Sequence, residues 1–169
     1  MQTIIGIDNG VTGSIAILTP DVPPIFTFVR VFKVRNYTKE EQHINRIDTD
    51  WLVRYIYNSL INQTDAIAVL ERPMVNYKAK SNTVSSALRA LEATAIVLES
   101  LKIPYSFMDS KQWQSHFFGA SVSGRVDLKR ASRDLGASLF PALAKDIIAH
   151  KDADALLIAH YYKEVLCTS

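Results

Sequence analysis

The stretch TIIGIDNGVTGSIAIL, residues 3–18, decides the expected fold of this chain. It contains two apolar, β-branched runs, residues 3–8 and 14–18, on either side of a glycine-rich turn sequence. Short apolar runs bounded by Asn and Gly are typical of two antiparallel strands joined by a tight turn. The first run ends on an acid, so the pattern also predicts a carboxylate, Asp8, at the end of a buried strand.

Outward from this pair of strands, hydrophobic periodicity predicts the remaining elements. Residues 25–34 alternate as a third strand, which would complete an antiparallel meander, and residues 35–48 are predicted to be a polar link. Further elements are expected as strands over residues 65–71 and 104–108 and as helices over residues 49–62, 82–101 and 152–165, with short helical pieces before the last helix. This order predicts an α/β fold with a mixed sheet, three antiparallel strands plus parallel strands, flanked by helices.

Composition limits the classes of protein that fit. With 169 residues and 48% hydrophobic content, the chain can fill one core but not two ordinary domains, so residues 1–169 are expected to form a single domain. Nineteen Lys and Arg residues face 17 Asp and Glu residues, so any affinity for nucleic acid must come from local clusters. The single cysteine, Cys167, and the absence of a secretion signal or membrane-spanning pattern favour a reducing, cytoplasmic setting.

Acidic residues stand where three separate segments are expected to meet. Asp8 and Glu71 end predicted strands, and Asp152 and Asp154 lie at the start of the last helix. Each acid alone has an ordinary explanation, as a turn former, a surface ion pair or a helix cap. Together they make a set of carboxylates suited to hard divalent cations such as Mg²⁺, which activate water for phosphodiester cleavage.

Three motifs resemble, in the same order along the chain, those of the RuvC-type Holliday junction resolvases, a family of the RNase H-like superfamily. GIDNGVTGSIAIL resembles the family's opening strand pair, LERP its second acidic strand end and KDADALLIAHY its last helix. The resemblance implies an RNase H-like fold and Mg²⁺ binding by Asp8, Glu71 and Asp154. It also implies two ions per active site, with Mn²⁺ able to substitute.

The same resemblance implies a substrate and a partner. Members of the family nick two opposed strands of a four-way DNA junction symmetrically, in DNA recombination and repair. The small chain would suit a phage or viral member acting in the cytoplasm of a bacterial host. In the family, the helix that follows the second acid pairs two subunits, so a homodimer through the helix over residues 82–101 is expected.

The fourth metal ligand is left open by a departure from the family pattern. The family's final acids are three residues apart, whereas Lys151 stands three residues before Asp154 here. Asp152 lies two residues before Asp154, a spacing that points away on an ideal helix, and His150 lies four before it on the same face. We favour Asp152, since the helix can begin after it, with His150 as the alternative.

Basic residues cluster between residues 102 and 133, where six Lys and Arg side chains face two acids. Basic side chains near a carboxylate cluster would hold the phosphate backbone of DNA. Lys129 matches the family's basic helix and is the first candidate, whereas Trp113 is expected in the core. The predicted DNA contacts are Lys129, Lys111, Arg125, Arg130, Lys78, Lys80 and Tyr77, the last as an aromatic that stacks on an unpaired base at the junction centre.

Three alternatives fit part of the pattern. An actin-like ATPase also opens on a strand, an acid and a phosphate-binding turn, but it needs two such lobes, which 169 residues cannot supply. An RNase H-like nuclease acting on flaps, RNA–DNA hybrids or RNA would carry the same acids. A nucleic-acid-binding module with weak catalysis would account for the altered spacing of Asp152 and Asp154.

Overall fold

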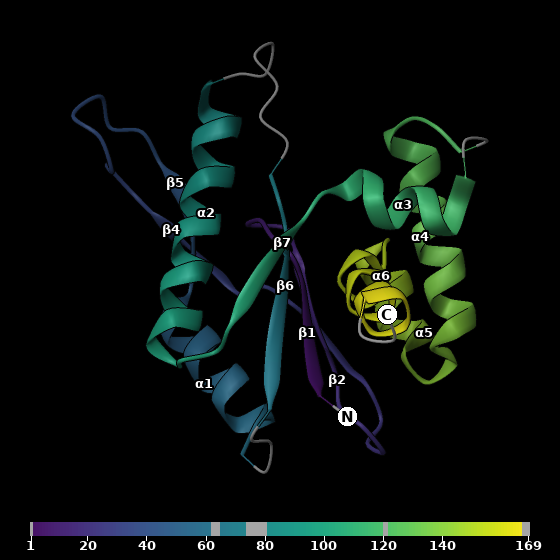
Figure 1. Cartoon of the computed structure of the whole chain (residues 1–169). Helices are drawn as coiled ribbons and strands as arrows, with labels where there is room; N and C mark the ends of the chain where they lie inside the picture. Colours follow the sequence, from purple (N-terminus) through teal and green to yellow (C-terminus); the bar gives the residue numbers. More distant parts are fainter. Residues whose placement is uncertain (1, 62–64, 74–80, 120–121, 167–169) are drawn as a thin grey trace.

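A five-stranded mixed sheet lies at the centre of the molecule (Figure 1). The computed structural model describes residues 2–61, 65–73, 81–119 and 122–166. The sheet has the order β3-β2-β1-β6-β7, and its strands are β1 (Thr3–Asp8), β2 (Ser14–Leu18), β3 (Ile25–Phe28), β6 (Ala66–Glu71) and β7 (Tyr105–Met108). Strands β1, β2 and β3 pair antiparallel, whereas β1, β6 and β7 pair in parallel. The predicted mixed sheet of three antiparallel strands plus parallel strands is confirmed.

Helices flank the sheet on both sides (Figure 1). One side carries α1 (Thr49–Ser59) and α2 (Ser81–Ser100), and the other carries α3 (Ser110–Phe118), α4 (Arg125–Leu139), α5 (Ala144–His150) and α6 (Asp154–Tyr161). A 3₁₀ turn (Pro141–Leu143) joins α4 to α5, and a π-helical turn (Tyr162–Leu166) follows α6. The helices predicted over residues 49–62 and 82–101 are confirmed. Among the described helices, none is both long and apolar enough to cross a membrane.

The two faces of the sheet contribute to separate cores because alternate side chains of a strand point to opposite faces. Ile5, Ile7 and Leu70 pack on the face covered by α1 and α2, where Ile56 and Leu98 also lie. Each of these side chains is almost fully buried, and such burial contributes about 1.5–3 kcal/mol per residue. This core fixes the directions of β1 and β6, the two strands that end on acids.

The second core anchors α6 to the other face of the sheet. Ile4 and Val69 pack there against an apolar run of α6, residues 155–159, whose members are all 0% exposed. Because α6 is hydrophobic all round, it lies buried between β1, β2 and the surrounding helices. Its first residue, Asp154, is therefore held at a fixed height above the sheet.

The prediction of one long third strand over residues 25–34 is wrong, because this segment forms two strands that belong to different sheets. Strand β3 ends at Phe28, and residues 31–34 belong to another pair, in which β4 (Val31–Val34) and β5 (Ile44–Ile47) form a separate two-stranded sheet. The break falls at Val29, which is buried and whose N–H donates to the Gly13 carbonyl at 3.0 Å. Strand β5 lies in the segment predicted as a polar link. It was not predicted because its sequence, INRI, is too short and too polar to indicate a strand.

Candidate active site

Parallel pairing of β1 and β6 brings the first two acids together. Ile7 is paired with Leu70, so the next residues along each strand, Asp8 and Glu71, end neighbouring strands at the same edge of the sheet. The two carboxyl groups lie close enough that the charge of Glu71 raises the pKa of Asp8. The sequence prediction that these strand ends meet in space agrees with this geometry.

Close packing of α6 on β1 brings Asp154 to the same place. A Cβ atom on Gly6 would lie 2.1 Å from the carbonyl oxygen of Ala155, so only glycine permits this approach. The helix begins at Asp154, and Asp152 precedes it with its side chain 3% exposed. Asp152 is therefore free of the helical geometry that would direct its side chain away from Asp154. The choice of Asp152 as the fourth metal ligand depended on this condition.

Helix α4 supplies the groups that contact these two acids. The Lys129 ammonium donates to Asp152 in an ion pair. The Ser132 hydroxyl donates to the Asp154 carboxylate and accepts the N–H of Ala153 at 3.0 Å. Helix α4 comes this close because Gly136 faces Ala153, where an added Cβ would lie 2.2 Å from the Ala153 Cβ.

Burial and mutual repulsion raise the pKa values of three of the acids. The pKa of Asp8 rises to about 8, mainly through burial and then through the charges of Glu71 and Asp152. The pKa of Glu71 rises to about 7 through burial and the charge of Asp154. The pKa of Asp154 rises to about 7 through burial and the charges of Asp152 and Asp8. The cluster holds more negative charge than it can stabilise alone, so it is suited to bind cations.

Lys129 compensates part of this charge. Burial lowers its pKa, but the hydrogen bond to Asp152 and the charges of Asp152, Asp154 and Asp8 outweigh burial, and the net shift is upward. In the described part of the chain, no other Lys or Arg forms an ion pair with these acids. One ammonium cannot neutralise four carboxylates.

His150 lies beside the cluster, at the end of α5. Ligand atoms of Asp8, His150 and Asp152 all lie within 4.8 Å of one another. Burial lowers the pKa of His150, and Lys129 adds to this while Asp152 opposes it, so the imidazole is neutral at pH 7 and able to bind a metal. Its Nε2 atom is buried without a hydrogen bond, 3.4 Å from Asp152 Oδ1. Both candidates for the fourth ligand, Asp152 and His150, are thus brought to Asp8.

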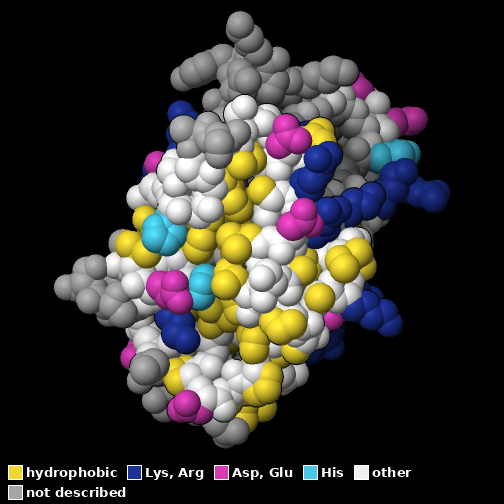
Figure 2. Space-filling view, turned by 90° about the vertical axis from the view of Figure 1, so that its right-hand side faces the viewer, with side chains coloured by type: hydrophobic (Ala, Val, Ile, Leu, Met, Phe, Trp, Pro, Cys, Tyr) yellow, Lys and Arg dark blue, Asp and Glu magenta, His cyan; other side chains and the backbone are white. Residues whose placement is uncertain are grey.

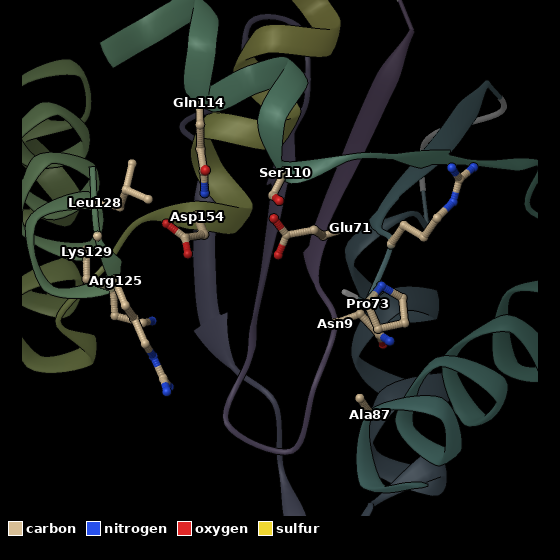
Figure 3. Close-up of a pocket in the computed structure, with 12 residues that line it drawn as sticks. Asn9, Glu71, Pro73, Ala87, Ser110, Gln114, Arg125, Leu128, Lys129 and Asp154 are labelled. Atoms are coloured by element: carbon tan, nitrogen blue, oxygen red, sulfur yellow. The ribbon is translucent and has the colours of Figure 1, made fainter. Parts of the chain in front are cut away.

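A pocket of about 510 Å³ opens in front of the acids (Figure 3). The carboxylates of Glu71 and Asp154 point into the same space, with Gln114 directly above Asp154. Arg125 and Lys129 line the side formed by α4. The pocket therefore combines acids that suit a cation with basic side chains that suit a phosphate.

The structure separates the predicted DNA contacts into three groups. Lys129 and Arg125 line the pocket, whereas Lys111 and Arg130 are exposed and lie outside its lining. Figure 2 views the molecule from the side of α4, and Lys and Arg side chains gather toward the upper right of this face, with Asp and Glu side chains beside them. The remaining predicted contacts, Tyr77, Lys78 and Lys80, lie outside the described residues.

Trp113 and Ser132 each contact one acid of the site. Trp113 was expected in the core, and its exposure of 1% confirms this, but its Nε1–H also donates to Glu71 Oε1 at 3.3 Å. Ser132 was missed altogether, although it is 1% exposed and contacts Asp154. A serine inside a polar helix carries no signal of its own, and only the close packing of α4 on Ala153 reveals its role.

Known proteins similar to this chain were found by comparing structures and not by comparing sequences. No protein-family model and no curated protein matches the chain. A structure of Thermus thermophilus RuvC in complex with a Holliday junction substrate is 12% identical, with a TM-score of 0.54 over 96% of this chain and 93% of RuvC. A second RuvC structure from the same organism is 13% identical, with a TM-score of 0.51 over 96% and 95%. The fowlpox virus Holliday junction resolvase is 14% identical, with a TM-score of 0.49 over 98% and 99%. The two RuvC structures show that the chain has a RuvC-like fold.

Proposed function

We propose that this chain is a structure-selective endodeoxyribonuclease that resolves four-way and other branched DNA junctions by metal-dependent hydrolysis. The observation that carries the proposal is the clustering of Asp8, Glu71, Asp152 and Asp154 beside Lys129, with Glu71, Asp154 and Lys129 lining the pocket. Three of the four have raised pKa values, so the cluster is unfavourable without a cation. A charge arrangement of this kind is costly for stability and is characteristic of a functional site.

The residues present fit a pair of Mg²⁺ ions. Asp8 contacts both halves of the cluster, since its charge interacts with Glu71 on one side and with Asp152 on the other. Asp8, Glu71, Asp152 and Asp154 would hold the ions, with His150 as a further ligand beside Asp8 and Asp152. When bound, such ions would supply an activated water and stabilisation of the leaving oxygen of a phosphodiester. Mn²⁺, which accepts imidazole more readily than Mg²⁺ does, is expected to substitute.

The protein's own groups would then hold and orient the DNA strand. Arg125 lines the open side of the pocket and would contact a phosphate oxygen. Lys129 is partly exposed and already lies between the acids and this opening, so it would move its contact from Asp152 to the scissile phosphate once cations neutralise the acids. Ser132 and Trp113 keep Asp154 and Glu71 in place through hydrogen bonds.

A symmetric dimer through α2 would place two such sites on two opposed strands. Its support is Leu88 on α2, which is 46% exposed while other positions of the helix are buried. An exposed apolar side chain on a helix that otherwise packs against its own chain is suited to a helix–helix interface. Sedimentation of the protein with and without junction DNA tests this. A monomer in both conditions would remove the dimer from the proposal.

The substrate is tested by comparing cleavage of a synthetic four-way junction with that of linear duplex, a flap and an RNA–DNA hybrid. The proposal predicts that wild type cuts the junction fastest in Mg²⁺ and that Asp8→Asn cuts none of them. Faster cleavage of the flap or the hybrid would show that the chain is a nuclease with a different substrate. If wild type binds DNA but cuts none of these substrates in Mg²⁺ or Mn²⁺, the chain is instead a nucleic-acid-binding module.

A further inference from the structure

The hairpin formed by β4 and β5 lies beside α2 (Figure 1). Two adjoining hollows, of about 210 and 240 Å³, share the lining residues Val11, Tyr37, Asn45 and Arg89. We call these two hollows together the hairpin groove. Val11 belongs to the turn that follows β1, three residues after Asp8. The groove therefore begins next to the segment that holds the acids and leads away from the cleavage pocket.

The hairpin is more basic than the rest of the chain. Residues 30–46 contain five Lys and Arg residues and two Glu residues, an excess of three positive charges, whereas the whole chain has a net charge of +2. All five basic residues are exposed, and they are Arg30, Lys33, Arg35, Lys39 and Arg46. Arg30 pairs with Asp48 at the base of the hairpin. Within the described part of the chain, the other four form no ion pair.

Two arginines of the groove are held against aromatic rings. The Arg89 guanidinium lies 5.9 Å from the Tyr37 ring centroid, and Arg46 lies 6.0 Å from that of Phe32. A guanidinium over an aromatic face is attracted by the ring, and its N–H groups can still donate to an anionic acceptor. The Nε atom of Arg89 is buried and has no hydrogen-bond partner. A buried donor of this kind is unfavourable until a ligand supplies an acceptor.

Several neutral residues of the groove are hydrogen-bond donors, and they lie beside apolar residues such as Val11, Ile47 and Ile96. Asn45, Asn82 and Ser86 line it together with His43, and Glu92 is the acidic side chain of the lining, in the hollow farther from the hairpin tip. Donors and positive charge on the walls of a narrow groove suit a phosphodiester backbone. A second copy that placed its own basic hairpin in this groove would be repelled, and pairing of two chains through Leu88 of α2 does not require this, because Leu88 does not line the groove.

We propose that the hairpin groove binds the phosphate backbone of one duplex arm of the branched substrate, away from the cleavage pocket. The inference rests on the proposed function, because it takes branched DNA as the ligand. It adds a second contact region that explains how a small enzyme selects a branched structure: the pocket holds the strand to be cut while the hairpin groove holds an arm that leaves the junction in another direction.

The test is the affinity for a four-way junction, measured by fluorescence anisotropy with the Asp8→Asn protein so that the DNA stays intact. Arg46→Glu and Arg89→Gln are each introduced, with Arg54→Glu as the matched control, because Arg54 is an exposed arginine of α1 outside the groove. Each groove variant is expected to weaken binding about 10-fold and to lower the slope of log affinity against log salt by about one. The control is expected to change neither.

Shortening the arms of the junction supplies a second readout. With arms too short to reach the hairpin groove, the groove variants and the control should bind equally well. In the enzymes that keep Asp8, Arg46→Glu should raise KM on the long-armed junction and leave kcat within about twofold, because the groove lies outside the acid cluster. Thermal unfolding of each variant confirms that the fold is kept.

Other outcomes overturn the inference in distinguishable ways. If wild type cuts the junction while the groove variants bind like the control, the hairpin groove does not hold DNA and the proposed function stands. If Arg46→Glu changes self-association in sedimentation and leaves DNA affinity unchanged, a second copy occupies the groove. If wild type neither binds nor cuts branched DNA, the proposed function fails and this inference fails with it.

Discussion

The ammonium of Lys129 forms an ion pair with Asp152, whose side chain is 3% exposed, while that of Lys129 is 42% exposed. One partner is thus fixed inside the acid cluster and the other reaches into the open pocket. Such a pair stabilises the metal-free cluster and still leaves the lysine able to contact a substrate.

Replacing Lys129 tests its compensating role. Lys129→Gln leaves a buried carboxylate without its cation, so the free energy of unfolding in the absence of metal should fall by about 1–2 kcal/mol, the partial exposure of Lys129 keeping the loss moderate. Saturating Mg²⁺ should reduce this loss. Junction cleavage should fall about 100-fold because a phosphate contact is removed. Lys145→Gln on α5, an exposed lysine, serves as the control. A stability loss that Mg²⁺ does not change would contradict the assigned role.

Ser132 is predicted to stabilise Asp154. Ser132→Ala removes the donor to that carboxylate and the acceptor of the Ala153 N–H, both buried, so urea unfolding should show a loss of about 1–3 kcal/mol. Mg²⁺ affinity, measured by calorimetry, should weaken as Asp154 loses its fixed position. Ser100→Ala at the exposed end of α2 should cost less than about 0.5 kcal/mol. Equal effects of the two substitutions would show that the Ser132 contacts carry no special weight.

The approach of α6 to β1 is predicted to depend on Gly6. Gly6→Ala places a methyl group 2.1 Å from a backbone oxygen of α6, so α6 must move, and the loss of stability should be about 3 kcal/mol. The same substitution at Gly10, whose added Cβ would have no atom nearer than 4.0 Å, should cost less than about 1 kcal/mol. Thermal unfolding distinguishes the two, and a tolerated Gly6→Ala would mean that α6 packs less closely than described.

The raised pKa values predict an unusual dependence of stability on pH. Asp8, Glu71 and Asp154 titrate near 3.8 to 4.5 in an unfolded chain and near 7 to 8 in the folded one. Below this window both states are protonated and the groups make no difference. Within it the unfolded chain releases protons first, so metal-free stability falls as pH rises from about 4 and levels off above about pH 8.

Mg²⁺ should reverse this trend, because it binds the ionised acids of the folded state and stabilises it by mass action. Melting temperatures measured between pH 5 and pH 9 in chelator and in Mg²⁺ test the prediction, with a shift of about 2–4 °C for each kcal/mol. Asp8→Asn should lose most of the Mg²⁺ effect. Metal-free stability that rises from pH 5 to pH 8 would contradict the raised pKa values.

The strands and the two strand-ending acids could be predicted because local signals and tertiary structure agree there. Residues 3–8 and 66–71 are apolar runs that end on an acid, and parallel pairing of buried strands is the arrangement that brings such ends together. The last helix was predicted to begin at residue 152, whereas α6 begins at Asp154 and leaves Asp152 before it. The position of Asp152 next to His150 depends on the left-handed turn at Lys151, where φ is +79°, which no sequence signal indicated.

What could not be predicted depends on contacts between distant segments. Strand β5 is stabilised by pairing with β4, and four residues with two polar members do not indicate a strand by themselves. The contact of Ser132 with Asp154 requires the close approach of α4 to Ala153, and the position of Arg89 beside Tyr37 requires the hairpin to lie along α2. These arrangements arise from packing and leave no local pattern in the sequence.

The central claim is that Asp8 lies at the centre of a metal site that cuts branched DNA. The most direct measurement maps the nicks made in Mg²⁺ on a four-way junction labelled in turn on each strand, with wild type and Asp8→Asn. The proposed function predicts paired nicks at equivalent positions on two opposed strands with wild type, and none with Asp8→Asn. Nicks of equal yield with both proteins, or an intact junction with wild type in both Mg²⁺ and Mn²⁺, would contradict it.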